Sequence, residues 1–332
     1  MLRQAFIVTA LLVPMCHAAP SFAGMQQDLA NCTAAKGLNS AAACTRVMNS
    51  GRLPRAQFYI GHFNRGSGYR RAGEFAKALA DFQKVVKLKP RFARGYHARG
   101  LAYADQGKID KAIADLDQAI KLNAKDWSTY YSRATLRRTD GDYEAALQDL
   151  KTASELNPST KEIGLLRALV LADKGAVTVA RAEINKIISD GGSNASSYYA
   201  RAEVAFAEKR LDAAEEDVER VLKLTSDFGA AHLLMGRIQA SRGDTNGAKS
   251  HYRKAVAAPV AFLESRSVTR EAQERLDALE PGHNGGSKTT PVASASDDET
   301  SATVASKKQM GSGECRLYLP STGLTVSTPC DQ

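Results

Sequence analysis

The sequence has no apolar run of the roughly 18 residues that a membrane-spanning helix needs, which argues against an integral helical membrane protein. Aromatic residues make up only 7% of the 332 positions, and Trp127 is the single tryptophan. This composition argues against a β-sandwich or an aromatic-rich binding sheet. There is no Cys-x-x-Cys motif, so neither a zinc site nor a thioredoxin-like redox site is indicated.

Catalytic motifs are missing as well. The chain contains no phosphate-binding glycine-rich loop, no His-Glu-x-x-His and no Gly-x-Ser-x-Gly, and its histidines share no repeated pattern. We therefore expect a protein that is not an enzyme and that uses no cofactor or metal. The net charge of +9 raises the question of nucleic acid. The positive charge is discontinuous along the chain, however, so a phosphate-binding track is not expected.

What is present begins with an export signal. Arg3 precedes an apolar run from Ala5 to Val13, and Ser21-Phe22-Ala23 fits a cleavage site before Gly24. Cleavage after Ala18 or Ala19 is an alternative, and lipidation at Cys16 is disfavoured by the preceding Pro14-Met15. Residues 1–23 are thus expected to be a signal peptide. The protein is expected to be periplasmic or secreted.

Cysteine usage agrees with export. Without Cys16 the chain keeps four cysteines, an even number that suggests disulfides in an oxidising compartment. They form two groups at opposite ends of the chain, which favours local pairing within each group among the three possible connectivities. We therefore expect the bonds Cys32–Cys44 and Cys315–Cys330.

The middle of the chain repeats every 34 residues without insertion from Tyr59 to Phe262. Position 20 of the repeat is alanine in all six blocks, and position 8 is always glycine or alanine. Small residues there let two antiparallel helices approach closely, and larger residues at positions 4 and 24 fill the space between them. Position 15 is glycine in every block except the fifth, which has Lys209; glycine there supplies the positive φ of a turn. Each block therefore predicts a helix–turn–helix unit.

These residues resemble the tetratricopeptide repeat (TPR) family, with Asn64-Arg65-Gly66 and Gly141–Ala146 matching its pattern especially well. The resemblance covers six full repeats, about 60% of the chain, and is weakest in the fourth block, which has Gly164 and Leu171. It implies an all-α fold, a right-handed superhelical solenoid of helix–turn–helix repeats. It also implies an exported bacterial protein whose concave groove binds protein partners.

Flanking segments complete the expected organisation. Residues 24–58 predict a disulfide-stapled helical N-terminal cap for the repeats of residues 59–262, and the apolar stripe in 263–280 predicts a capping helix. Residues 281–313 are rich in Ser, Thr, Gly and Asp without apolar periodicity, which indicates a disordered linker. Alternating apolar residues in 314–332 predict a small β-hairpin closed by a disulfide.

A second pair of columns carries charge. Position 7 is arginine and position 23 is a carboxylate in the first five blocks, and the sixth block replaces both, with Met235 and His251. Because the two are lost together, we expect structural ion pairs rather than an anion track. The expected pairs are Arg65 with Asp81, Arg99 with Asp115, Arg133 with Asp149, Arg167 with Glu183, and Arg201 with Asp217.

In relatives of this type, positions 2, 5, 9, 12 and 13 line the concave groove. The resemblance therefore assigns partner binding to an aromatic floor with arginines toward its N-terminal end. These residues are Phe63, Arg70, Arg71, Arg94, His97, Tyr131, Arg138, Tyr199, Phe206 and Arg237.

We expect a non-catalytic protein–protein interaction scaffold in the bacterial periplasm, with a partner segment of acidic character bound beside the arginines of the first block. Arg70 and Arg71 lie off the packing columns, so their loss is expected to weaken binding and spare stability. One alternative is an envelope-biogenesis or secretion accessory factor. Another is a cell-wall or carbohydrate-binding module that uses the aromatic groove or the terminal hairpin. The sequence leaves the oligomeric state open.

Overall fold

The computed structural model describes residues 22–34, 37–51, 53–259 and 263–280, and two strands, 315–319 and 324–328. Within these residues the chain forms fifteen α-helices, a short 3₁₀ turn at Arg55–Gln57 and one β-hairpin. The helices are α1 (Phe22–Thr33), α2 (Leu38–Asn49), α3 (Phe58–Arg71), α4 (Phe75–Leu88), α5 (Ala93–Asp105), α6 (Ile109–Leu122), α7 (Trp127–Asp140), α8 (Tyr143–Leu156), α9 (Lys161–Asp173), α10 (Val177–Ser189), α11 (Ala195–Ala207), α12 (Leu211–Leu224), α13 (Gly229–Ser241), α14 (Thr245–Ala257) and α15 (Leu263–Leu279).

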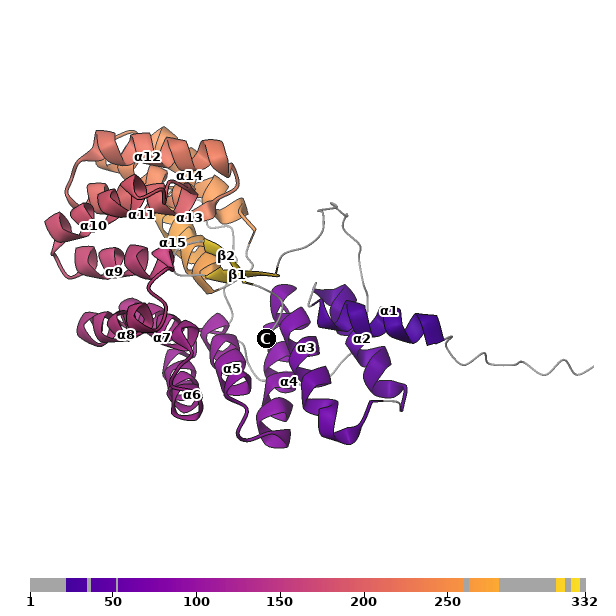
Figure 1. Ribbon diagram of the computed structural model, residues 1–332. Helices are drawn as coiled ribbons and strands as arrows, with labels where there is room; N and C mark the ends of the chain where they lie inside the picture. Colours follow the sequence, from indigo (N-terminus) through magenta and orange to yellow (C-terminus); the bar gives the residue numbers. More distant parts are fainter. Residues whose placement is uncertain are drawn as a thin grey trace, which may run out of the picture.

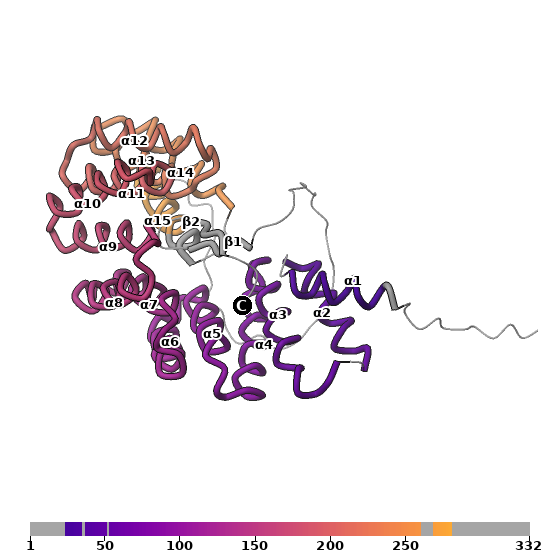
Figure 2. The backbone as a smooth tube through the Cα atoms, in the orientation of Figure 1, coloured from indigo at the N-terminus to yellow at the C-terminus, as the bar shows by residue number. Residues whose placement is uncertain are grey.

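The helices from α3 to α14 form six consecutive pairs, one pair for each 34-residue block. Each pair packs against the next, and the stack bends into an arc that runs from α3 and α4 to α13 and α14 (Figures 1 and 2). The predicted all-α solenoid is therefore confirmed. No helix of the described residues is both long and apolar enough to cross a membrane.

Close packing within each pair depends on matched sizes at positions 8 and 24. A Cβ added to Gly66 would lie 2.9 Å from the ring of Phe82, so glycine is needed opposite this large side chain. Gly236 faces Tyr252 in the same way. Where position 8 is alanine, the partner at position 24 is aliphatic and fully buried. These aliphatic partners are Leu150, Ile184 and Val218.

The turn within each repeat uses a left-handed residue at position 15. The five glycines of this column have φ between 74° and 95°, and Lys209 adopts φ 60° in the fifth repeat. The N–H of Lys209 donates to the carbonyl of Phe206, which closes the end of α11. The turn geometry therefore persists without glycine, at the cost that a β-carbon carries in this region.

Lys209→Gly is expected to stabilise the protein by about 0.5–1 kcal/mol, because it relieves this backbone cost at an exposed position. The matched control is Gly243→Lys, whose β-carbon would meet no atom within 4 Å. Its expected loss of stability thus reports the backbone alone. Urea unfolding of both variants is the measurement. A Lys209→Gly protein less stable than the parent would contradict this account of the turn.

The N-terminal cap consists of α1 and α2, which pack against each other and on α3. Cys32 and Cys44 are fully buried and joined by a disulfide with an S–S distance of 2.06 Å. Helix α1 begins at Phe22, within the predicted cleavage site. Residues 1–21 lie outside the described residues, so the signal peptide stays a prediction.

At the other end, α15 covers the last repeat. Ala272 and Leu276 pack against Tyr252 and Ala255 of α14, so the apolar face of the repeats does not end exposed at this point. In the hairpin, β1 (Cys315–Leu319) pairs antiparallel with β2 (Leu324–Thr328), with Leu317 opposite Val326. The linker 281–313 and Cys330 fall outside the described residues, and the Cys315–Cys330 bond stays a prediction.

Candidate functional site

The first helices of the repeats, α3, α5, α7, α9, α11 and α13, carry the residues that the sequence assigned to partner binding. We call the surface formed by positions 2, 5, 9, 12 and 13 of these helices the first-helix surface. Its polar side chains are held by contacts between neighbouring repeats, and these contacts decide which groups remain available to a partner.

Arg70 is committed to the neighbouring repeat. Its Nε donates to Asp105 Oδ2 at 2.5 Å, and the Asp105 side chain is only 1% exposed. The guanidinium thus neutralises a carboxylate that would otherwise be buried without a counter-charge. Arg70 is therefore not an unpaired anion ligand, and we expect its loss to cost stability, because its guanidinium joins α3 to α5.

The same arrangement recurs two repeats later. Arg138 of α7 donates to Asp173 of α9 at 2.6 Å. Asp173 and the more distant Glu203 raise the pKa of Arg138 against the effect of burial. Arg138 is therefore also held within the array. It is not an unpaired ligand.

A third cluster lies on α11 and α13. The hydroxyl of Tyr199 donates to Glu203 at 2.7 Å, and Arg237 approaches the other oxygen of Glu203 at 3.7 Å. The Arg237 guanidinium also lies 4.5 Å from the centre of the Phe206 ring. Burial raises the pKa of Tyr199, and the Glu203 charge adds to this effect. Tyr199 is therefore a neutral hydrogen-bond donor at ordinary pH.

Two of the assigned residues make contacts within the array. Tyr131 is 1% exposed and belongs to the core of the central repeats, so it does not offer its ring to a partner. His97 lies 3.1 Å from the hydroxyl of Ser132 in the next repeat. Burial lowers the pKa of His97 to about 4, which keeps the imidazole neutral. Tyr131 is therefore buried in the framework, whereas the partly exposed His97 stays a candidate for partner contact.

The available part of the surface lies in the first two repeats. Phe63, Tyr59 and Phe92 form an aromatic cluster with ring-centre distances of 5.6 Å from Phe63 to Phe92 and 5.3 Å from Tyr59 to Phe92. Arg94 is exposed and lies 5.4 Å above the Phe63 ring. Arg71 is exposed at the end of α3. This region offers apolar rings beside the accessible Arg94, and a second exposed cation, Arg71, lies at the far end of α3, the helix that carries Phe63.

The Arg–carboxylate columns form ion pairs within repeats, between the first and second helix. The distances are 2.8 Å for Arg65–Asp81, 2.7 Å for Arg99–Asp115, 2.5 Å for Arg133–Asp149, 2.8 Å for Arg167–Glu183 and 2.6 Å for Arg201–Asp217. The four aspartates of the column are buried, with residue exposures from 3% to 7%. These pairs therefore act in the framework of the solenoid, and none faces a ligand alone.

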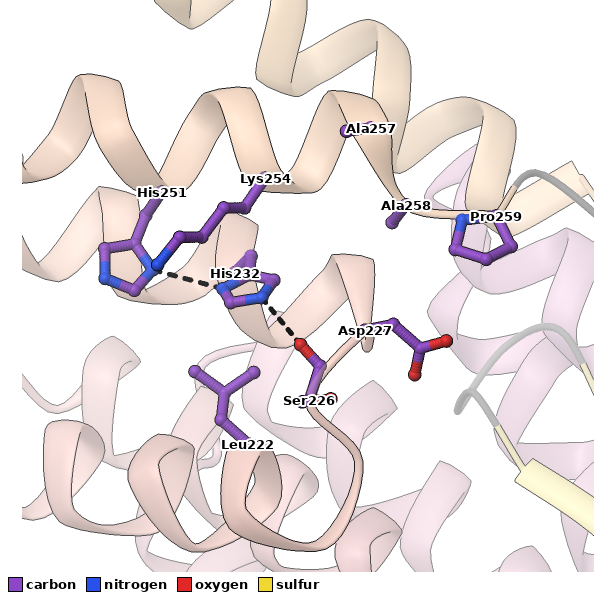
Figure 3. Close-up of a pocket in the computed structure, with 9 residues that line it drawn as sticks. All are labelled: Leu222, Ser226, Asp227, His232, His251, Lys254, Ala257, Ala258 and Pro259. Atoms are coloured by element: carbon purple, nitrogen blue, oxygen red, sulfur yellow. Dashed lines mark hydrogen bonds between the residues drawn. The ribbon is translucent and has the colours of Figure 1, made fainter.

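The sixth repeat replaces the ion pair with a histidine contact. His232 Nδ1 lies 3.1 Å from His251 Nδ1, and His232 Nε2 lies 3.0 Å from the Ser226 carbonyl. Burial and the neighbouring histidine lower the pKa of His251 to about 4, so the pair is neutral near pH 7. Figure 3 shows both rings beside Lys254 in an open pocket of about 490 Å³.

This pocket lacks the ligands of a metal site. Asp227 points away from the two imidazoles in Figure 3. In the described part of the chain, no group of three or more His, Cys, Asp or Glu side chains is arranged to hold a metal ion. The contact joins positions 4 and 23 of its repeat, as His62 and Asp81 do at 2.8 Å in the first repeat.

Sequence reasoning missed Asp105, Asp173 and Glu203, the carboxylates that hold the arginines of the first-helix surface. A signal for the first two exists. Arg70 and Asp105 are 35 residues apart, as are Arg138 and Asp173, and so are His97 and Ser132. A spacing of one period plus one residue joins position n of one repeat to position n+1 of the next.

Comparisons with known proteins agree with this architecture. Models described as "TPR repeat" match residues 66–107 and 100–137, and models described as "Tetratricopeptide repeat" match 131–196 and 199–262. A tetratricopeptide repeat protein from Parabacteroides merdae has a similar structure, with a TM-score of 0.63 and 18% identity over 75% of this chain and 97% of that one.

The Cut9–Hcn1 hetero-tetramer of the APC/C contains another similar chain, with a TM-score of 0.54 and 15% identity. That match covers 70% of the present chain and 48% of the other. At such low identity, both likenesses support the fold alone. No curated protein shows significant sequence similarity.

Proposed function

Because the chain belongs to the tetratricopeptide repeat family, we propose that it is a non-catalytic scaffold of the bacterial periplasm that binds a segment of a partner protein in the concave groove of its first helices. The repeats themselves indicate a protein-interaction scaffold. The predicted N-terminal export signal and the buried Cys32–Cys44 disulfide support the periplasmic location, because such bonds persist in oxidising compartments.

One observation carries the proposed binding site. Among the arginines assigned to the first-helix surface, Arg70 and Arg138 are held by buried or half-buried carboxylates, whereas Arg94 is exposed over the Phe63 ring. Arg71 adds a second exposed cation. The partner segment is therefore expected to place an apolar side chain on the Phe63–Phe92–Tyr59 cluster and an acidic side chain near Arg94 and Arg71.

The test is crosslinking and capture from cells that carry the native chain. Protein released by osmotic shock is expected to have its N-terminus between residues 19 and 24, as determined by mass spectrometry. Arg71→Ala/Arg94→Ala is expected to weaken capture of the partner about tenfold and to flatten its salt dependence, because two exposed charges are lost.

A matched control is Lys151→Ala/Lys223→Ala, which removes two exposed charges from the second helices α8 and α12. It should capture the partner as the parent chain does. The proposal fails if the control loses the partner as strongly as the arginine variant, or if the chain remains in the cytoplasm with residues 1–23 attached.

A further inference from the structure

The first repeat carries eight basic and two acidic residues, yet most of its excess charge does not lie on the first-helix surface. Arg65 and Arg70 are neutralised by Asp81 and Asp105, and Lys77 is paired with Glu74 at 3.3 Å. Apart from Arg71, the remaining cations gather at the end of α4 and in the loop after it. All four are exposed: Lys84, Lys87, Lys89 and Arg91.

The second repeat continues this charge in register. Lys121 occupies the position of Lys87, and Lys125 occupies the position of Arg91, each exactly one 34-residue period further on. Because equivalent positions of successive repeats line the same side of a solenoid, these side chains extend one surface. We call Lys84, Lys87, Lys89, Arg91, Lys121 and Lys125 the basic edge. It ends at the third repeat, where Glu155 and Ser159 take the two positions.

No carboxylate of the described residues is paired with the side chains of the basic edge. The segment from Phe82 to Ala104 contains no acidic residue. In the following loop, Asp126 is engaged as the N-cap of α7, where its side chain accepts from the Ser128 N–H and the Thr129 hydroxyl. Asp117 on α6 accepts from Arg133 at 2.6 Å. The basic edge is therefore a solvent-exposed surface whose charges are all positive.

We propose that the basic edge docks the solenoid on an anionic phospholipid surface. Five of its six cations are lysines, whose compact ammonium groups suit loosely ordered phosphate headgroups, whereas a defined carboxylate partner favours the bidentate fork of arginine. Leu88 lies among them with 52% of its surface exposed, so one apolar side chain can enter the bilayer interface.

Vesicle co-sedimentation with the chain as recovered from cells tests this proposal. One set of vesicles contains equal parts of phosphatidylglycerol and phosphatidylcholine, and the other contains phosphatidylcholine alone. The parent chain is expected to bind the anionic vesicles and to leave them as salt is raised. Lys87→Gln/Lys121→Gln/Lys125→Gln is expected to bind about a hundred-fold more weakly, since each cation near an anionic surface contributes several-fold.

Two further variants separate the possible explanations. Lys108→Gln/Lys111→Gln/Lys209→Gln removes the same charge from exposed positions off the edge and should bind as the parent does. Leu88→Ser should weaken binding to vesicles but not to inorganic polyphosphate, because only a bilayer accepts the leucine. Circular dichroism checks that every variant is folded.

Three results would overturn the proposal. Equal binding to neutral vesicles would show that the charge of the basic edge does not carry the attachment. Equal losses in the edge and control variants would reduce the effect to net charge. The third result has two parts: polyphosphate binds tightly and loses affinity in the edge variant, and Leu88→Ser binds vesicles as well as the parent does. Together they would identify a site for a free polyanion in place of a membrane.

Discussion

Replacing Asp149 by alanine is expected to lower the free energy of unfolding by about 3–5 kcal/mol. The Asp149 side chain is 3% exposed and accepts from Arg133 at 2.5 Å and from Arg137 at 2.8 Å. Its removal leaves two partly buried guanidinium groups without this carboxylate. The decrease in the free energy of unfolding therefore comes mainly from leaving partly buried arginines without a counter-charge. The net contribution of the intact ion pair is smaller.

Asp117→Ala provides the matched control, because Asp117 contacts the same Arg133 at 2.6 Å but is 41% exposed. Its loss is expected to stay below about 1 kcal/mol. Urea unfolding, followed by circular dichroism and by the fluorescence of Trp127 on α7, measures both. Equal losses in the two variants would show that burial does not set the value of these pairs.

Arg70→Ala is expected to cost about 3 kcal/mol of stability, because it leaves the buried Asp105 without its arginine. Arg94→Ala is expected to cost less than about 1 kcal/mol, since Arg94 is exposed and only stacks on Phe63. The two substitutions thus separate an arginine of the framework from an arginine available to a partner. Thermal unfolding of both variants is the measurement. An Arg70→Ala protein as stable as the parent would contradict the assignment of Arg70 to the framework.

The fold could be predicted from the sequence because helix packing requires particular residue sizes at fixed positions of the 34-residue repeat. Alanine at position 20 and the small residue at position 8 are required wherever two helices approach closely, so the 34-residue spacing survives even where other columns fail. Lys209 illustrates this. The turn glycine is absent there, yet the residue takes the left-handed conformation because the flanking helices determine the path of the chain.

The candidate site was predicted less well, because a position within one repeat does not show what the next repeat places beside it. Tyr131 and Arg70 occupy positions that face the groove in relatives, but Tyr131 is buried in the core of the central repeats and Asp105 neutralises Arg70. Such contacts depend on inter-repeat packing. In the sequence, such a contact corresponds to two residues 35 positions apart. The pair can be recognised only when both residues are polar.

The net charge of a repeat did not show which of its faces carries the charge. The positive charge of the first repeat was assigned to the first-helix surface, whereas four of its exposed cations lie at the end of α4 and in the loop after it. The basic residues of α3 are arginines, and Arg65 and Arg70 pair with carboxylates. The lysines at the end of α4 remain exposed. The net charge of a repeat does not distinguish the first-helix surface from the end of α4, because successive residues of a helix point to different sides of its axis.

The central claim, that the first-helix surface of the N-terminal repeats holds a partner segment, is tested most directly by site-specific photocrosslinking in intact cells. A benzophenone side chain replaces Ile60, an exposed position 2 of α3, or Ala114, which is exposed on α6. The account predicts one discrete protein adduct from position 60, lost when Arg94→Ala is added, and none from position 114. An adduct at position 60 that is unaffected by Arg94→Ala, or an equally strong one at position 114, would contradict it.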